Sequence, residues 1–581
     1  MKNILKITGV VIVGLTLTIR CNEVLDKKNL AAVRPDQVWT DVNTATAYLN
    51  DIYSQLMPLN TAGGGNDTDE GVPYTRQTNV WLRGTATFDS QNSLGVYDHI
   101  RTINILLANL GDATFSQGDK DKLKGQALFW RAWAYHRMVK DHGGVPLILE
   151  AQQPTTDLTQ IQKPRNKTSE CVAQILKDLD DAAALLPDAF TDSDFGRIDK
   201  GVALAFKGRA LLFYASPLFS GLGGVASWQK AYDANKAAKD FLDSKGKGLY
   251  RPYSKIWDDE LNKEAVMVRR FNYPQSTYFQ GGLMPLNWSK DLTGQDRPSL
   301  ELVNAFPMKD GSAWDPATMD YGRLFMNRDE RFYANIYYNG APNQYLKGMR
   351  DDKTYLWVYY NSISNYNGKE GIEGVHNKIT DEGTLPSGSG FYRIKAIDKT
   401  IDKGTVSNAA VDWIEIRYAE VLMNYGECAN EVEKTTEALD VLKQIRARAG
   451  IDGGNGNYGI TAASQAEIRE AYKKERFVEF CFEGKRWDDL RRWKMFGYLR
   501  ALPQRHGLAI LLKPGQDDVS PLSDISAIWN NFTYTVIAKD AVDIAIKDQY
   551  YIYGIPLTIL NRNPLFKQNK GWGEGDFDPL Q

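Results

Sequence analysis

The sequence predicts a mostly α-helical fold, in which helical hairpins form a scaffold like that of tetratricopeptide repeats and a loop-rich insertion carries short β-hairpins. Three observations predict it. Amphipathic helices occur in both halves of the chain, they follow one another as hairpin units of roughly 30 to 40 residues, and the segment between the two sets is rich in Gly, Asn, Tyr and Trp. We therefore expect helices to form the framework and the central segment to display loops on it.

The first element is a short apolar segment at the N-terminus. Two lysines precede an apolar run over residues 7–19, which is shorter than the roughly 20 residues of a membrane span. This pattern predicts a signal peptide of the lipoprotein type over residues 1–20, with Cys21 as the acylated first residue of the mature chain. Arg20 stands where such signals carry a small residue. Simple export and an uncleaved tether therefore remain alternatives.

Four helices are expected in the N-terminal half. The stretch "ECVAQILKDLDDAAALLP" places Val172, Ile175, Leu176 and Leu179 at helical spacing and ends at a proline, as an amphipathic helix does. Consecutive helices joined by a short polar link form an antiparallel hairpin. The four predicted helices cover residues 122–144, 170–187, 200–217 and 228–244.

The insertion runs from about residue 250 to 410, and a second helical set follows it. Within it, "EAVMVRRF" (264–271) has the composition of a strand, and "RFYANIYYNG" (331–340) that of a strand and a turn. The later helices are expected over residues 414–432, 436–450 and 465–487. We predict an N-terminal region (21–250) and a C-terminal region (251–581) packed as one globular unit.

The composition argues against several classes of function. Lys and Arg number 70 against 72 Asp and Glu, so no field of one sign exists to attract nucleic acid. Cys171, Cys428 and Cys481 lie far apart in helical patterns, which predicts core thiols. The five histidines show no metal-binding spacing, and no nucleophile elbow, P-loop or dinucleotide fingerprint is present. We expect no cofactor, although the loop "GGGNDTDEG" (63–71) offers oxygen ligands to a structural calcium without EF-hand spacing.

Eight stretches, taken in order, carry a family resemblance. They are "CNEVLDKK" (21–28), "ALFWRAWAYHRMVKDHGGVPLILE" (127–150), "GRIDKGVALAFKGRALLFYASPLF" (196–219), "ELVNAFPMKDG" (301–311), "RDERFYANIYYNG" (328–340), "IEIRYAEVLMNYGECANE" (414–431), "FVEFCFEGKRWDDLRRWK" (477–494) and "YIYGIPLTILNRNPLFKQNKGW" (551–572). Together they resemble the SusD/RagB family of outer-membrane nutrient-binding lipoproteins of Bacteroidetes, nearly end to end. The segment after Cys21 resembles the one that follows the lipidated cysteine of the family, which favours acylation.

Some of these motifs are expected to hold the fold. The charged side chains of "FVEFCFEGKRWDDLRRWK" can pair with one another beside a buried aromatic stripe, so we interpret this stretch as structural. His136, on the helix "RAWAYHRMVK", is expected to be a packing histidine and not a metal ligand. "RDERFYANIYYNG" is likewise interpreted as a folding signature.

Ligand-binding residues are expected among aromatic and planar polar side chains in polar loops. A sugar ring packs its C–H face on an indole or phenol, and its hydroxyls bond to Asn, Asp and Arg. The resemblance implies that such side chains come from one N-terminal loop and from one before "ELVNAFPMKDG". The predicted residues are Asn66, Asp67, Tyr74, Trp81 and Arg83 in the first loop, Tyr278, Asn287 and Trp288 in the second, and Trp357 in a third stretch. The alternative is that these rings pack under their own loops or against a partner.

The resemblance implies a non-enzymatic, lipid-anchored protein of the outer-membrane surface. It would capture an oligo- or polysaccharide and deliver it to a SusC-like TonB-dependent transporter. Three alternatives remain. The chain could be a peptide-binding importer component of the RagB type, a surface glycosidase, which is disfavoured because no pair of acids stands out, or a transporter plug with a vestigial site.

Overall fold

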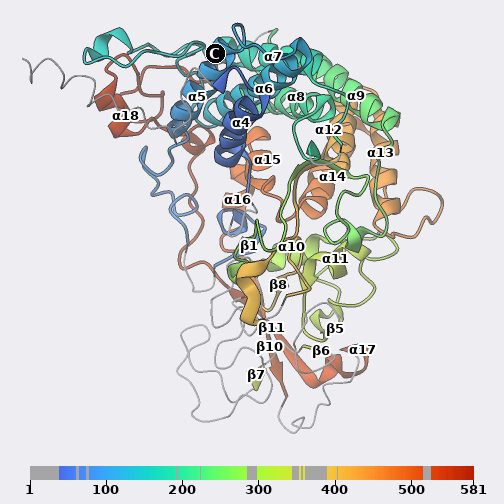
Figure 1. Cartoon of the computed structure of the whole chain (residues 1–581). Coiled ribbons are helices and arrows are strands. Elements are labelled where there is room, and N and C mark those ends of the chain that lie inside the picture. Colours follow the sequence, from blue (N-terminus) through green and yellow to red (C-terminus); the bar gives the residue numbers. More distant parts are fainter. Residues whose placement is uncertain are drawn as a thin grey trace, which may run out of the picture.

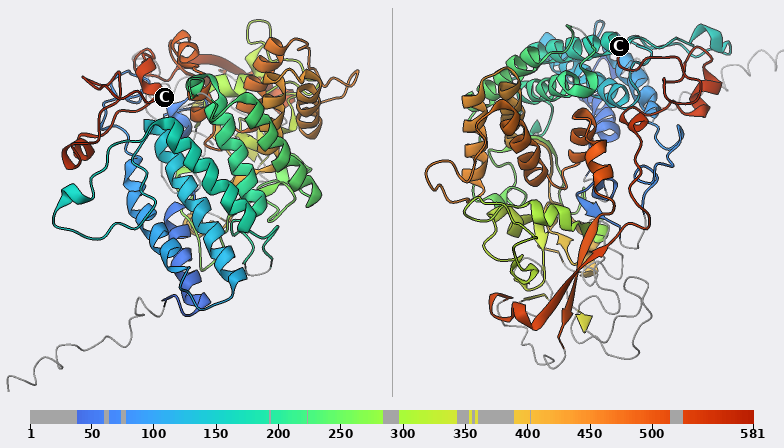
Figure 2. Two further views of the ribbon diagram at one scale, coloured as in Figure 1. Left: turned by 90° about the horizontal axis from the view of Figure 1, so that it is seen from above. Right: turned by 180° about the vertical axis from the view of Figure 1, so that it is seen from behind.

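A layer of helices forms the upper part of the molecule, and loops with short strands lie below it (Figure 1). The computed structural model describes residues 38–59, 64–73, 78–191, 194–222, 224–283, 297–342, 353–354, 358–359, 389–401, 403–513 and 525–581. The N-terminal helices are α4 (Val42–Leu56), α5 (Tyr97–Asn109), α6 (Gln117–His142), α7 (Thr168–Leu185), α8 (Lys200–Ala215) and α9 (Trp228–Ser244). Seen from above, they lie side by side (Figure 2), and α6 packs on α7 as α8 packs on α9.

The ends of these helices follow from their sequences. Helix α6 begins where the Ser116 side chain accepts a hydrogen bond from the Asp119 N–H, which satisfies one of the free amides at a helix start. It ends at Gly143, whose φ of 76° is left-handed, and a Cβ there would lie 2.5 Å from Pro579. The four helices predicted in this half are confirmed, with boundaries shifted by a few residues.

The second helical set continues the layer. Its members are α12 (Tyr418–Glu431), α13 (Thr435–Arg448), α14 (Gln465–Glu479), α15 (Arg486–Arg492) and α16 (Phe496–Ala501). Helix α12 packs on α9, α13 and α14, so it connects the two sets. A capping box of Ser464 and Glu467 starts α14.

The strands of the described residues form small, separate sheets. Strand β1 (Gly71–Val72) pairs with β3 (Arg297–Pro298), β2 (Ala265–Arg269) with β9 (Trp413–Arg417), β4 (Ile336–Tyr337) with β8 (Tyr392–Arg393), and β5 (Ala341–Pro342) with β6 (Lys353–Thr354). The largest sheet has the order β11 (Phe532–Ala538), β10 (His506–Leu512), β7 (Val358–Tyr359). Short helices α10 (Leu300–Ala305), α11 (Glu330–Asn335) and α17 (Ile525–Ile528) lie among them, whereas α18 (Leu557–Arg562) lies beside the helical layer (Figure 1).

The main hydrophobic core combines both halves of the chain. Phe129, Trp130 and Tyr135 of α6 are fully buried, and the same cluster contains Ile416 and Trp572. The three cysteines expected as core thiols are buried and unpaired, which confirms that prediction. Burial raises the pKa of Cys171 and of Cys481 to about 12, so both remain protonated thiols at neutral pH.

Buried ion pairs join the helices to the insertion. The Arg417 guanidinium lies 2.7 Å from carboxylate oxygens of Glu264 and Glu479 and 2.9 Å from Glu483. Burial alone would raise the pKa of Glu479. The guanidinium groups of Arg417 and two other arginines nevertheless hold that pKa well below its usual range. The charged side chains of the stretch 477–494 were expected to pair with one another, but most of these arginines pair with distant carboxylates: Arg486 with Asp69, Arg491 with Asp141, and Arg492 with Glu427 as well as with Asp489. The structural interpretation of this stretch is confirmed.

Three local predictions are wrong in detail. The expected helix over 414–432 begins only at Tyr418, because the preceding WIEIR segment forms β9 and pairs with β2. Residues 330–335 form the short helix α11, capped by Asp329, ahead of the expected strand. The hairpin of β10 and β11 was not expected, since its strands lie outside the predicted insertion. Within the described residues, no helix has both the length and the apolar character required to cross a bilayer.

Candidate functional site

The first predicted ligand-binding loop pairs with the strand that follows the second one. Strand β1 lies within the first loop, and β3 follows the second loop in the sequence. The two strands pair antiparallel, with Gly71 opposite Pro298 and Val72 opposite Arg297. The Ser299 hydroxyl and N–H also donate to the main-chain carbonyls of Asp69 and Glu70. We call residues 66–72, 78–84 and 297–301 the loop edge. Most of them are buried, and those that reach solvent are Asn66, Asp67, Asn79, Val80, Arg83 and Glu301.

The side-chain amide of Asn79 holds the predicted residues Asn66 and Asp67 in place. The Asn79 side chain donates to the Asp67 carboxylate at 2.6 Å and to the Asn66 carbonyl at 3.3 Å, and it accepts from the Leu82 N–H at 2.8 Å. Burial raises the pKa of Asp67, and the Asn79 hydrogen bond works against that shift. The arrangement presents an acceptor carboxylate in a half-buried, fixed position, as a hydroxyl-bearing ligand requires.

An arginine from the far end of the chain fixes the course of this loop. One nitrogen of the Arg505 guanidinium donates to the carbonyls of Asn66, Thr68 and Gly71 at 2.6 to 2.9 Å. Its other nitrogens pair with the Asp540 carboxylate at 2.7 and 3.0 Å. Both side chains are buried, so water does not compete for these bonds. The loop edge is therefore preorganised by its main chain.

The other two predicted residues of this loop lie apart from that cluster. The Trp81 side chain is only 9 % exposed, and its ring packs against those of Tyr553 and Tyr550, with centroids 4.7 and 5.3 Å away. Protein covers the indole, as expected of a core residue. Arg83 follows in a turn and is exposed.

In the described part of the second loop, the predicted Tyr278 is packed against protein and two neighbouring rings are more exposed. The Tyr278 N–H donates to the Ala409 carbonyl, and its ring packs edge-on against Phe271 at 4.9 Å. Its neighbours are more open, because Tyr273 is 65 % and Phe279 54 % exposed. Exposed aromatic rings of this kind provide flat faces for stacking.

Three residues that the sequence did not single out complete the loop edge. Tyr498 of α16 is 43 % exposed, and burial of its hydroxyl and a hydrogen bond to Asp69 raise its pKa. The His506 ring and N–H both bond to the Glu301 carboxylate, at 2.7 and 3.1 Å. This hydrogen bond raises the pKa of His506. One signal was available: Phe496 and Leu499 form the buried face of α16, which leaves Tyr498 off that face.

Two acidic side chains of the first loop bond to different parts of the chain. Asp69 pairs with Arg486 at 2.7 Å, while Glu70 accepts from the Phe482 N–H at 3.3 Å. Burial raises the pKa of Glu70 to about 8. No group of three or more His, Cys, Asp or Glu side chains among the described residues is arranged to hold a metal ion.

The remaining predicted site residues lie outside the described residues. These are Tyr74, Asn287, Trp288, Trp357 and the lipidation site Cys21. Their roles stay predictions. On the described part, the loop edge offers carboxylates, amides, a histidine and a half-exposed phenol around a fixed main chain. Such a surface can bind a ligand rich in hydroxyls without any chemical step.

Comparisons with known proteins agree on one family. A model of the SusD family matches residues 254–572, and a second model, described as "Starch-binding associating with outer membrane", matches residues 75–212. The SusD-like protein P2 of Formosa agariphila is 24 % identical over 406 residues, which cover 69 % of this chain and 70 % of that protein.

Solved structures share the fold. A SusD-like protein from Bacteroides fragilis aligns with a TM-score of 0.70 and 23 % identity over 94 % of this chain and 100 % of its own. A SusD-like carbohydrate-binding protein from the same species gives a TM-score of 0.69 and 21 % identity over 91 % of this chain and 99 % of its own. With more than half of its length matched by the first family model, the chain belongs to the SusD family.

Proposed function

We propose that this chain captures an oligo- or polysaccharide at the loop edge and delivers it to a SusC-like TonB-dependent transporter. One observation carries the proposal: strand β1 of the first predicted loop pairs with β3, which follows the second predicted loop in the sequence, and Tyr498, Glu301 and His506 lie beside that pair. The outer-membrane description of the second family model and the carbohydrate-binding relative support it.

The physical basis is stacking combined with hydrogen bonding. A pyranose places its C–H face on an open phenol such as Tyr498, and its hydroxyls find acceptors in the Asp67 and Glu301 carboxylates. These acceptors are already oriented by Asn79 and His506, so little conformational entropy is lost on binding. No covalent step enters this function, and the protein acts as a binding component and not as an enzyme.

The first experiment is retardation in native gels cast with plant, host and microbial polysaccharides, using the chain from Asn22 onward. Tyr498→Ala removes the half-exposed ring. Tyr250→Ala is the matched control, because its hydroxyl also bonds to an aspartate, Asp259, at 2.6 Å but lies outside the loop edge. We expect one glycan to retard the protein and the control, and Tyr498→Ala to migrate freely.

Other outcomes would redirect the proposal. Equal retardation of both variants would place the glycan elsewhere on the molecule. No retardation by any glycan would favour a peptide ligand, tested next with an oligopeptide panel, or a plug that binds only its transporter. Release of reducing ends on long incubation would reveal a glycosidase.

The proposed anchor is a lipid on Cys21, which would keep the protein at the cell surface beside its transporter. Mass spectrometry of the N-terminus from isolated membranes tests this directly. A diacylated or triacylated Cys21 is expected, whereas an intact N-terminus that retains residues 1–20 would refute the anchor.

A further inference from the structure

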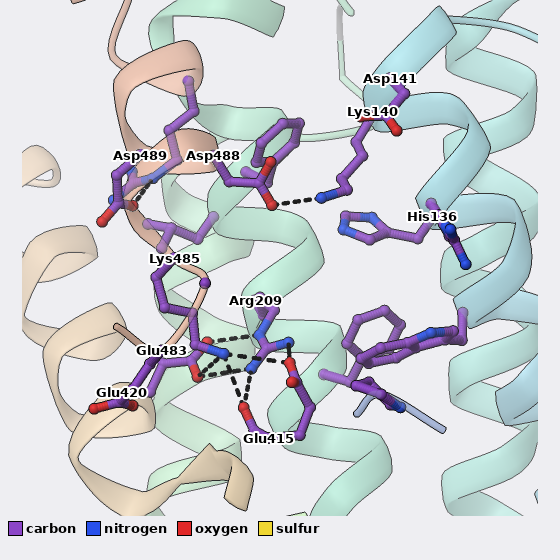
Figure 3. Close-up of a pocket in the computed structure, with 18 of the residues that line it drawn as sticks. His136, Lys140, Asp141, Arg209, Glu415, Glu420, Glu483, Lys485, Asp488 and Asp489 are labelled. Atoms are coloured by element: carbon purple, nitrogen blue, oxygen red, sulfur yellow. Dashed lines mark hydrogen bonds and ion pairs between the residues drawn. The ribbon is translucent and has the colours of Figure 1, made fainter. Parts of the chain in front are cut away.

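A second hollow lies inside the helical scaffold and shares no residue with the loop edge. It has a volume of about 480 Å³, within the range of pockets that hold small organic ligands. Its walls come from the end of α4, from α6 and α8, and from α12, α14 and α15 with the turn before α15 (Figure 3). The exposed side chains of Gln55 and Leu59 lie at its edge.

One wall of the cavity is aromatic. Trp133 of α6 is half-buried, and its ring centroid lies 4.6 Å from that of Phe206 on α8. Phe213, two turns further along the same face of α8, also lines the cavity. Rings that meet a cavity in this way give a ligand apolar contact area and a face for C–H groups.

Satisfied ion pairs connect α6 and α8 with the opposite walls of the cavity. Lys140 lies 2.6 Å from Asp488, and Arg209 bonds to the carboxylates of Glu415 and Glu420 at 2.6 to 2.7 Å. The lining contains equal numbers of basic and acidic side chains: Arg137, Lys140, Arg209, Arg476, Lys485 and Arg492 against Asp141, Glu415, Glu420, Glu483, Asp488 and Asp489. A charged ligand would gain no net attraction here. A neutral molecule can bond to the ion pairs through hydroxyl groups.

His136 contributes a buried polar ring to the cavity lining. Its side chain packs edge-on against Phe206, Phe213 and Tyr214, which confirms the expected packing role, and the residue is 8 % exposed. The Nδ1 atom nevertheless has no hydrogen-bond partner among the described residues. Figure 3 shows the imidazole directed into the space between the Lys140–Asp488 pair and Arg209. A buried nitrogen without a partner costs free energy, and a bound hydroxyl would remove that cost.

We propose that this cavity binds a neutral, polyhydroxylated small molecule of mono- or disaccharide size. The ligand would place its C–H face near Trp133 and Phe206 and bond to His136 and to the Lys140–Asp488 pair. The site is separate from the loop edge, and its volume of about 480 Å³ suits a short saccharide, so it would recognise short saccharides while the loop edge takes long chains.

The test follows His136 directly by NMR of the full chain labelled with ¹⁵N-histidine. Addition of glucose, galactose, maltose, cellobiose or myo-inositol is expected to shift the His136 resonance saturably for at least one of them. His99 lies on α5 outside the cavity lining, so its signal is the internal control. Affinity is measured in parallel by calorimetry.

Two variants assign the site. His136→Phe keeps the edge-on packing but removes the nitrogen, and Asp488→Asn keeps the shape but breaks the pair with Lys140. Each is expected to weaken binding about five-fold or more, the loss of one hydrogen bond. Because Asp488 is partly exposed, Asp488→Asn remains informative if His136→Phe does not fold. Tyr498→Ala is expected to leave this binding unchanged.

The proposal would be overturned if no saccharide or polyol moved the His136 resonance, which would show that the cavity holds water alone. Binding lost in Tyr498→Ala but retained in both cavity variants would also overturn it, since all capture would then occur at the loop edge. Failure of polysaccharide retardation bears only on the loop edge, so the two proposals fail independently.

Discussion

Replacing Glu70 by Gln should stabilise the protein at alkaline pH far more than at acidic pH. Glu70 is 3 % exposed directly before β1, and burial raises its pKa to about 8 against the positive charges of Arg486 and Lys395. A raised carboxyl pKa means that the folded state keeps the proton while the unfolded chain releases it. The stability that protonated Glu70 contributes is therefore fully present below pH 4.5 and is lost as pH rises towards 8.

The size of the effect follows from the two pKa values. The pKa of Glu70 is 4.5 in the unfolded chain and about 8 in the folded chain. Ionisation of Glu70 therefore lowers the free energy of unfolding by about 3 to 4 kcal/mol between pH 5 and pH 8. Gln imitates the protonated carboxyl and can still accept from the Phe482 N–H, so the variant should lack this loss.

Urea denaturation of both proteins at several pH values measures the difference. Glu467→Gln is the matched control with the opposite sense, because hydrogen bonds from Ser464 and Ala463 lower the pKa of that exposed carboxyl. Its contribution should disappear as pH falls. Parallel stability curves for Glu70→Gln and the wild type would refute the reasoning, because they would show that Glu70 ionises in the folded state as it does in the unfolded chain.

Three further predictions concern the scaffold and the loop edge. Arg417→Met should lower the free energy of unfolding by about 3 to 5 kcal/mol in urea titrations, because it removes one buried cationic partner from each of Glu264, Glu479 and Glu483; a neutral result would contradict the network. Glu301→Gln should return the pKa of His506 towards 6.5 in an NMR titration, so the stabilising pair is present at low pH and lost as pH rises through the folded value; an unchanged titration would contradict that link. Trp81→Ala should cost about 3 to 5 kcal/mol in thermal unfolding while the folded fraction keeps its glycan affinity, and the reverse pattern would show that Trp81 contacts the ligand.

The sequence is most informative where a pattern is local. The four N-terminal helices follow from apolar periodicity and from breakers at their ends, and both features lie within each segment. Strand β9 was missed because WIEIR continues into α12 without a breaker. The burial of Trp81 depends on Tyr550 and Tyr553, which lie so far along the chain that no local pattern could reveal the contact.

The candidate site shows the same limit. The loops around Asn66 and Tyr278 could be chosen because their aromatic and polar residues fit no helical pattern. That β1 would pair with β3, and that Arg505 would reach the first loop, depends on tertiary pairing across hundreds of residues. Tyr498 and His506 enter the site for the same reason.

The hydrogen bonds between Arg505 and the main chain of the first loop have a consequence for evolution. It bonds to main-chain carbonyls, which every amino acid supplies, and makes no demand on the side chains that the loop presents outward. Substitutions at positions such as Asn66 can therefore change what the surface recognises without altering its path. A change in the ligand of this surface would then require the exchange of only a few outward side chains, while Arg505 and the helices behind the loop are retained.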